Sequence, residues 1–209
     1  MDSQALYIAI AIIAAYLIGS FPPAYVAGRL LKRVDIRQVG SRNMGAMNVF
    51  YTMGFPAGIT VLAIDIGKGA AAVALARWLG VPPVVELLAG AAAVAGHSFP
   101  VFLKFRGGKG GATCIGILIF LMPWGIPFYL AIFGLGLLLL HFPTLSYSIA
   151  FLSFPFVAWL WYHSAMFIIF SVVVLLLPGI RYIPRIKEMR AKGGSWRHVL
   201  LRRNMKDRL

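Results

Sequence analysis

The sequence predicts an all-α integral membrane protein with seven membrane-spanning helices. Three observations carry this prediction: 60% of the 209 residues are apolar, only 12% are charged, and the mean hydropathy is +0.84. In a soluble domain about a quarter of the residues are charged, whereas long apolar runs are typical of polytopic membrane proteins. We therefore expect one membrane domain over residues 1–180, followed by a basic cytoplasmic tail over residues 181–209.

Seven apolar runs are the candidate spans. The first run is too long for the apolar part of a cleaved signal peptide and further runs follow it, so we expect it to stay in the membrane. Proline and glycine interrupt the second half of the chain, which favours short or tilted helices there. The expected spans cover residues 5–31, 55–79, 83–103, 112–122, 124–140, 146–161 and 166–180.

The basic residues fall almost entirely into three clusters. Five lie between residues 29 and 42, three between 104 and 109, and ten between 181 and 208. Cytoplasmic loops are enriched in Lys and Arg, so the three clusters should share the cytoplasmic side. This places the N-terminus outside and the C-terminus in the cytoplasm, and it puts Ser146 at the cytoplasmic face.

The formal net charge of +14 suggests either nucleic acid or an anionic membrane surface as a partner. Half of the cations lie in the tail, where apolar residues such as Trp196 separate them, as expected for short amphipathic segments on a lipid leaflet. No nucleic-acid-binding module is recognisable. We therefore expect membrane lipid, and no nucleic acid, as a partner.

The sequence predicts no metal site and no cofactor. Cys114 is the only cysteine, which excludes an intrachain disulfide and a multi-cysteine metal site. We interpret it as a small apolar packing residue. The histidines are not spaced as metal ligands.

The segment from Gly96 to Thr113 sets three cations and a glycine cluster between apolar runs. Glycine lets a backbone close around a ligand and aim N–H groups at it, and Lys109 supplies a mobile positive charge. We expect this loop to bind an anion, with phosphate as its natural ligand. Its clustered glycines are Gly107, Gly108, Gly110 and Gly111.

Simple nucleotide motifs do not explain this loop. A Walker A loop needs glycine six residues before the lysine and Ser or Thr directly after it, but Leu103 and Gly110 stand there. A dinucleotide fingerprint that starts at Gly108 would need glycine in place of Thr113. None of the four histidines is followed five residues later by the aspartate that orients the base of one large acyltransferase class.

Another polar segment, which comes earlier in the chain, runs from Asp35 to Asn48. Cations, a hydroxyl and amides on a sharply turning backbone suit a phosphorylated polyol, while the alternative is a juxtamembrane turn that caps a helix. Both polar loops face one compartment, and so much polar backbone stabilises a membrane protein little. We expect one site for two phosphorylated groups, one of them lipid-borne. The polar residues are Arg37, Ser41, Arg42, Asn43 and Asn48.

These two segments resemble the first two signature motifs of the bacterial acyl-phosphate-dependent glycerol-3-phosphate acyltransferases, the PlsY family. The resemblance is continuous from about Gly19 to Thr113, and it includes the triplet DIR and the pair GS. The further matching residues are Gly19, Ser20, Pro22, Tyr25, Asn43, Gly45, Ala46, Asn48, Val49, Asp65, Lys68, Gly69, Gly96, His97, Pro100, Val101, Phe102, Phe105, Gly107, Gly108, Lys109, Gly110, Ala112 and Thr113.

The resemblance implies the transfer of an acyl group from acyl phosphate to the 1-hydroxyl of sn-glycerol 3-phosphate, giving lysophosphatidic acid and phosphate. It also implies seven helices in the bacterial inner membrane, with the N-terminus outside and the site facing the cytoplasm. We expect a monomer. An acyl phosphate is already activated, so the protein chiefly has to align two anionic groups and neutralise their charge.

The resemblance also implies the site residues. Ser41 and Lys109 are the expected catalytic residues, and they bind phosphate together with the amides of Gly107 and Gly108. A substrate phosphate can itself accept the hydroxyl proton. The other expected substrate-binding or phosphate-binding residues are Arg37, Arg42, Asn43, Asn48, His97, Gly110, Thr113, Ser146, His198 and Asn204.

Three polar residues of the motifs have an ambiguous role. His97 either orients a phosphate oxygen or hydrogen-bonds the glycine loop, and we favour the second role. Asp65 and Lys68 lie three residues apart in one span, so we expect a buried or interfacial pair that neutralises itself.

The chain departs from the family pattern at three places. Arg42 replaces the usual glycine, and Tyr51 stands where an arginine is expected, so Arg42 could supply the missing charge. The third motif is not recognisable, since His198 and Asn204 are six residues apart rather than three. Two alternatives therefore stay open: a paralogue with another acceptor, or a non-catalytic membrane homologue that binds lipid phosphate or anions.

Overall fold

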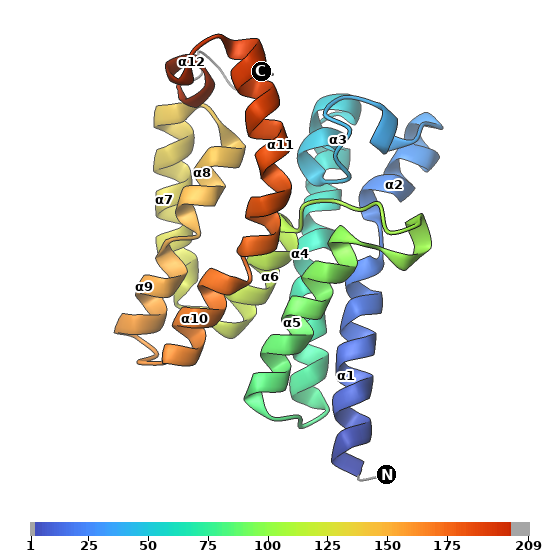
Figure 1. Cartoon of the computed structure of the whole chain (residues 1–209), viewed down its shortest axis with the longest axis vertical. Coiled ribbons are helices and arrows are strands. Elements are labelled where there is room, and N and C mark those ends of the chain that lie inside the picture. The colour runs from blue at the N-terminus through green and yellow to red at the C-terminus, as the bar shows by residue number, and fades with distance from the viewer. Residues whose placement is uncertain (1–2, 202–209) are drawn as a thin grey trace. The chain divides into compact units, whose positions relative to one another are not determined.

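The computed structural model describes residues 3–201, except for the side chain of His198, and these residues form helices and connecting loops without a β-strand (Figure 1). The chain divides into two compact units after Leu121. The elements of unit 1 are α1 (Ser3–Ser20), α2 (Pro23–Ala27), the π-helix η1 (Gly28–Lys32), the 3₁₀ helix η2 (Ile36–Gln38), α3 (Ala46–Met53), α4 (Phe55–Trp78), α5 (Pro83–Ser98), the 3₁₀ helix η3 (Val101–Leu103) and α6 (Gly111–Leu121). Those of unit 2 are α7 (Gly125–Leu140), α8 (Pro143–Ala150), α9 (Ser153–Leu160), α10 (Ala165–Val173), α11 (Leu176–Gly193) and α12 (Trp196–Leu200).

The described residues contain five helical segments that are long and apolar enough to cross a membrane. Two shorter apolar helices accompany them, Gly111–Leu121 and Gly125–Leu140. The 11 residues of α6 extend only about 16 Å, roughly half the thickness of a bilayer core. The all-helical class is therefore confirmed, while seven crossings and their orientation stay predictions. The five long segments are Ser3–Lys32, Phe55–Trp78, Pro83–Leu103, Pro143–Leu160 and Ala165–Gly193.

Glycines bring the long helices of unit 1 close together. A Cβ atom at Gly19 of α1 would overlap the carbonyl of Ala93 on α5, and one at Gly69 of α4 would overlap the carbonyl of Thr113 on α6. Helices in a membrane gain contact by such close approach of backbones at small residues. The α4–α6 contact at Gly69 matters for function, because it fixes the first turn of α6.

Short elements form the end of unit 1 that lies away from the N-terminus, where Figure 1 shows α2 and α3. Proline cannot continue a helix through its own amide. Helix α1 ends at Ser20, Phe21 and Pro22 follow it, and α2 begins at Pro23. The π-helix η1 then ends at Arg33, whose φ of 54° is left-handed. The chain can thereby turn and lead into the polar segment from Asp35 to Asn48, which contains η2 and reaches α3. This segment is called the first polar loop, and the segment from Gly96 to Thr113 is the second, or the glycine loop.

Unit 2 is built from shorter helices around aromatic side chains. The buried Tyr129 of α7 lies against Phe133, Phe151 and Phe154. The expected boundary between membrane domain and tail, at residue 180, falls inside the continuous helix α11. The single membrane domain with a separate tail therefore stays a prediction.

Candidate anion-binding site

Asn48 organises the first polar loop from the first turn of α3. Its side chain is 2% exposed. The Nδ2 group donates to the carbonyl oxygens of Ile36, Val39 and Asn43, each at 3.0 Å, and Oδ1 accepts from the Ser41 amide at 3.0 Å. Both N–H donors of the carboxamide are thereby occupied, since three carbonyl oxygens surround them, and Oδ1 accepts one hydrogen bond. In the structure Asn48 braces the loop, and its expected part in substrate binding stays a prediction.

The tip of this loop presents polar side chains outward. Ser41 and Arg42 are exposed, and Asn43 is half-buried. Arg42 has a left-handed φ of 58°, a conformation that glycine adopts without strain and other residues rarely do. This backbone explains why a glycine suits position 42, and why Arg42 is held there at some cost.

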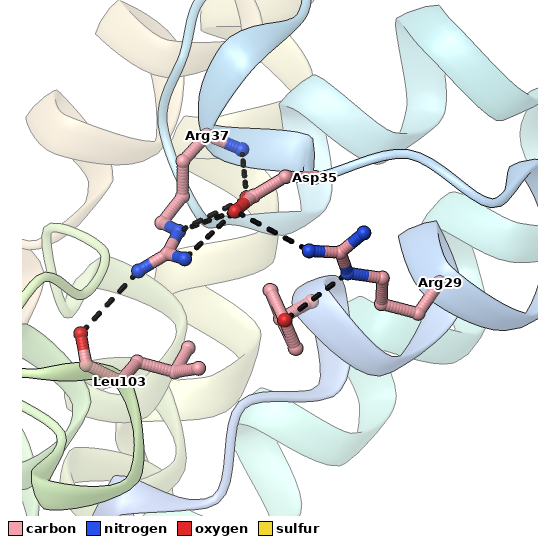
Figure 2. Close-up of polar contacts among 5 residues, drawn as sticks. Arg29, Asp35, Arg37 and Leu103 are labelled. Carbon is pink, nitrogen blue, oxygen red and sulfur yellow. Dashed lines mark hydrogen bonds and ion pairs between the residues drawn. The ribbon is translucent and has the colours of Figure 1, made fainter.

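Arg37 of the first polar loop contacts η3, the 3₁₀ helix that precedes the glycine cluster (Figure 2). Its Nε lies 2.9 Å from Asp35 Oδ1, its Nη2 lies 2.7 Å from Oδ2, and its Nη1 donates to the Leu103 carbonyl at 3.3 Å. The hydrogen bond from Arg37 holds the pKa of Asp35 below its ordinary value. The Arg37 guanidinium thus joins Asp35 to the Leu103 carbonyl, and its expected part in phosphate binding stays a prediction.

A second arginine shares this cluster. Arg29 Nη2 lies 3.9 Å from Asp35 Oδ2, and Figure 2 shows Arg29 and Arg37 on either side of that carboxylate. The guanidinium groups of Arg29 and Arg37 lie 5.1 and 5.2 Å from the centre of the Tyr25 ring, within the range of cation–π attraction. The carboxylate and the ring together compensate two cations close to the first loop.

The backbone of the glycine loop is anchored to the end of α5. The Gly107 amide donates to the Ser98 carbonyl and the Gly108 amide donates to the His97 carbonyl, both at 3.1 Å. These hydrogen bonds shape the loop, and the expected binding of phosphate by the two amides stays a prediction. Lys109, which follows, is half-buried.

The donors left for an anion lie just beyond Lys109, at the start of α6. Gly110 has a φ of 93°, and its carbonyl accepts the first helical hydrogen bond from the Cys114 amide at 2.9 Å. The amides of Gly111, Ala112 and Thr113 therefore precede the first intrahelical bond, as the first N–H groups of a helix do. Such a helix start carries partial positive charge and attracts anions. Together with Lys109, it gives one dense positive region.

The two polar loops meet at Gly108. A Cβ atom there would overlap both the carbonyl oxygen of Met44, in the first loop, and Nε2 of His97. A side chain at this position would push the loops apart, so the approach requires glycine. The expectation that the two loops lie together is confirmed at this point.

A buried polar cluster lies beneath the glycine loop. His97 Nδ1 is 3.2 Å from Asp65 Oδ1 and 3.3 Å from Thr113 Oγ1. Lys68 Nζ is 2.7 Å from Asp65 Oδ1 and donates to the Phe21 carbonyl at 3.0 Å. The expected pairing of Asp65 with Lys68 is confirmed. Its extension to His97 was missed, because residues 65 and 97 meet only through the packing of α4 against α5.

Three predicted residues belong to unit 2 or lie beyond the described structure. Ser146 is fully buried, and its hydroxyl donates to the Phe142 carbonyl at 2.9 Å within the first turn of α8. The side chain of His198 and the whole of Asn204 lie outside the described residues. Tyr51, in unit 1, contacts the ring of Phe50 edge-on with 5.5 Å between centroids.

Unit 1 also carries an apolar groove of about 510 Å³ beside the short elements. It lies between α2 and η1 on one side and α3 and α4 on the other. Nearly all of its lining is aliphatic or aromatic, as expected of a surface that receives a hydrocarbon chain. The lining residues are Phe21, Pro23, Val26, Ala27, Leu30, Leu31, Met53, Pro56, Ala57, Thr60, Val61 and Ile64.

Comparison with known proteins gives a consistent result. Residues 9–192 match the sequence model of a family described as glycerol-3-phosphate acyltransferase. Glycerol-3-phosphate acyltransferase 2 of Dehalococcoides mccartyi is 55% identical over 206 residues and covers 98% of both chains. Glycerol-3-phosphate acyltransferase of Bacillus velezensis is 50% identical over 141 residues, which are 68% of this chain and 72% of that one.

Solved structures show the same likeness. A crystal structure of PlsY (YgiH), an integral membrane glycerol 3-phosphate acyltransferase in its glycerol 3-phosphate form, superposes with a TM-score of 0.79 at 31% identity. The match covers 90% of this chain and 92% of the other. The lysophosphatidic acid form of that protein superposes with a TM-score of 0.76 at 30% identity, with the same shares of the two chains covered.

Proposed function

The chain belongs to the glycerol-3-phosphate acyltransferase family, and we propose that it transfers an acyl group from acyl phosphate to the 1-hydroxyl of sn-glycerol 3-phosphate. It is therefore an integral membrane acyltransferase. The products of the proposed reaction are lysophosphatidic acid and phosphate. Solved structures of a relative in glycerol 3-phosphate and lysophosphatidic acid forms support this acceptor and product.

The observation that carries the proposal is the meeting of the two polar loops at Gly108 and Met44. One loop exposes Ser41 and Arg42. The other contains Lys109 and runs into the amino-terminal end of α6. A reaction between two phosphorylated molecules needs two such anion-binding elements close to each other, because each substrate repels the other in water.

The chemistry asks little of the protein beyond positioning and charge neutralisation. The 1-hydroxyl oxygen attacks the acyl carbonyl carbon, a new ester C–O bond forms, and the bond between that carbon and the phosphate oxygen breaks. The hydroxyl proton passes to a substrate phosphate, so phosphate leaves as a stable anion. In this proposal Lys109 and the first amides of α6 hold the phosphate of one substrate, and the Ser41 hydroxyl donates a hydrogen bond to it.

The acceptor phosphate needs a cation of its own. Arg42 is exposed beside Ser41, and we propose that it takes the place of the arginine that the family pattern expects at position 51. A guanidinium can bind phosphate with two parallel hydrogen bonds. Asn43 stands next in the chain and is a proposed ligand of the glycerol hydroxyls.

The apolar groove supports a lipid-borne donor, because an aliphatic chain can lie against α2, η1 and α4. Seven spans, an outer N-terminus, a cytoplasmic site and residence in the bacterial inner membrane complete the proposal. The clustered cations support that orientation. A monomer suffices, since unit 1 alone carries both polar loops.

The unrecognised third motif favours a second candidate, a paralogue that uses the same donor but another acceptor. Ser146, His198 and Asn204 remain proposed acceptor-binding residues.

The relative of 55% identity that spans 98% of this chain is itself named a glycerol-3-phosphate acyltransferase. This favours glycerol 3-phosphate as the acceptor over the alternative.

The test is an assay of the purified protein in detergent with labelled glycerol 3-phosphate and either palmitoyl phosphate or palmitoyl-coenzyme A as donor. We expect lysophosphatidic acid with palmitoyl phosphate only. The substitution Lys109→Ala should abolish product formation, whereas Lys192→Ala, which removes a 60% exposed lysine of α11, should leave it unchanged. Product from the thioester alone would refute the proposed donor. In a parallel assay another labelled polyol phosphate replaces glycerol 3-phosphate, and product from that acceptor alone would support the paralogue.

A further inference from the structure

The most unusual feature outside the two polar loops is the buried cluster of Asp65, Lys68, His97 and Thr113. The exposed fractions of these side chains are 1%, 6%, 3% and 0%. Burying charges among membrane-spanning helices is costly, and such groups are retained where they support function. The proposed reaction does not use the side chain of any of the four in contact with a substrate.

The contacts of His97 connect this cluster to the glycine loop on both sides of the ring. Nδ1 faces the Asp65 carboxylate at 3.2 Å and the Thr113 hydroxyl at 3.3 Å. Nε2 lies against Gly108, and the backbone carbonyl of His97 accepts the Gly108 amide. A carboxylate beside one ring nitrogen fixes the orientation of the imidazole. The ring therefore sits in a fixed place under the loop.

Thr113 connects the same histidine to the start of α6. It lies in the first turn of that helix, among the amides that precede the first intrahelical bond. Its backbone carbonyl also lies close to Gly69 of α4. One imidazole thus determines the spacing between Gly108 and the amino-terminal end of α6, and Lys109 stands between these two points in the chain.

We infer that His97 and Thr113 are positioning residues, which hold the glycine loop and the first turn of α6 in the arrangement that binds a substrate phosphate. Asp65 orients His97, and Lys68 balances the charge of Asp65. The inference rests on the proposed function, because these residues would support the same loop that is proposed to bind phosphate. None of the four side chains has to touch the substrate.

The test compares isosteric and conservative variants at two positions. Thr113→Val removes the hydroxyl and keeps the shape, whereas Thr113→Ser keeps the hydroxyl. His97→Ala removes the ring, whereas His97→Asn keeps a donor near the place of Nδ1. Val94→Ala, a cavity in the same helix α5 at a residue that is 2% exposed, is the control for a loss of stability alone.

We expect Thr113→Val and His97→Ala to raise the KM of one substrate about tenfold to a hundredfold, as misplacement of a binding loop does. That substrate should be the one whose KM also rises in Lys109→Arg, and the KM of the other should stay unchanged. Thr113→Ser should stay within about twofold of the parent, and His97→Asn should fall between the parent and His97→Ala. Val94→Ala should lower the melting temperature without changing either KM.

Equal effects on both substrates, or a Thr113→Ser variant as impaired as Thr113→Val, would show a merely structural cluster and overturn the inference. Binding of palmitoyl phosphate and of glycerol 3-phosphate, measured by calorimetry without turnover, keeps the two proposals distinguishable. A parent protein that binds either ligand but makes no product refutes the proposed function only. The inference then stands or falls on whether His97→Ala and Thr113→Val weaken that binding.

Discussion

Arg42 shows how one residue can serve binding at the expense of backbone strain. It is exposed beside Ser41, and its φ of 58° lies in the left-handed region. A non-glycine residue costs about 1–2 kcal/mol in that conformation. The strain makes sense if the guanidinium holds the acceptor phosphate, since glycine would relieve it but would carry no charge.

The substitution Arg42→Gly should therefore separate stability from binding. We expect a net gain of about 0.5–1 kcal/mol, because relief of strain exceeds the extra freedom of glycine in the unfolded chain. The KM for glycerol 3-phosphate should rise about tenfold with the loss of a charge-assisted contact. The readouts are the melting temperature in detergent and steady-state kinetics.

The matched control is Arg33→Gly, because Arg33 is also exposed and has a φ of 54°. It should gain stability in the same way without a change in KM. An unchanged KM in the Arg42 variant would reject the idea that Arg42 replaces the arginine expected at position 51.

At the scale of elements, close packing and capping set the positions of the functional loops. Asp35 caps η2, since its Oδ1 accepts from the Arg37 amide at 3.0 Å, and Gly69 of α4 admits the first turn of α6. Each contact is made by a backbone atom, the Arg37 amide in one and the Thr113 carbonyl in the other. Both contacts help to set the positions of the first polar loop and of the first turn of α6.

The Asp35 cap predicts a defined pH dependence. The folded-state pKa of Asp35 is lowered by the hydrogen bond from Arg37, so folding favours the ionised carboxylate. Its stabilisation should be fully present above the unfolded-state value near pH 4 and should be lost as the pH falls through the lower folded-state value. Amide-exchange protection of residues 35–48 should stay constant from about pH 8 to 5 and fall below about pH 4.

In Asp35→Asn, the same segment should have lower protection throughout and lose the acid-dependent fall. A loss of protection between about pH 8 and 6 in the parent protein would contradict the assignment, because no lowered carboxyl pKa can produce it.

The contact between α4 and α6 predicts unequal effects of two neighbouring alanine substitutions. A Cβ atom at Gly69 would overlap the Thr113 carbonyl, whereas one at Gly67 on the same helix would meet nothing within 4 Å. Gly69→Ala should destabilise the protein by about 1–3 kcal/mol through overpacking and should lower activity by displacing α6. Gly67→Ala should be neutral or stabilise by up to about 1 kcal/mol.

Thermal unfolding and product formation of the two variants provide the comparison. Equal melting temperatures would show that α6 does not pack closely against α4 at residue 69. The position of the glycine loop would then need another explanation.

At the scale of the whole molecule, the apolar runs predicted the helical membrane class, and the two signature segments predicted the family and the meeting of the loops. The sequence could not reveal that Asn48 braces the first loop, because its partners are backbone groups that sequence does not distinguish. It also could not reveal that Arg37 reaches the Leu103 carbonyl, which lies far away in the chain. The contact of His97 with Asp65 was equally hidden. It depends on small residues that let α4, α5 and α6 approach, and not on any local spacing.

The proposed topology can be tested with single cysteines in a Cys114→Ala background. We expect a membrane-impermeant maleimide to label Ser3→Cys in spheroplasts, and to label Ser195→Cys only after the membrane is opened. Because Cys114 is buried, its removal should not disturb the surface. Labelling of Ser195→Cys in sealed spheroplasts would place the cationic end of the chain outside and would overturn the orientation.

The central claim is that the two polar loops bring an acyl phosphate and glycerol 3-phosphate together for direct acyl transfer. The most direct measurement follows phosphate release and lysophosphatidic acid formation in the same reaction. We predict one molecule of each per turnover, and phosphate release that depends on glycerol 3-phosphate. Phosphate release without lysophosphatidic acid, or no turnover in the fully folded protein, would contradict the account.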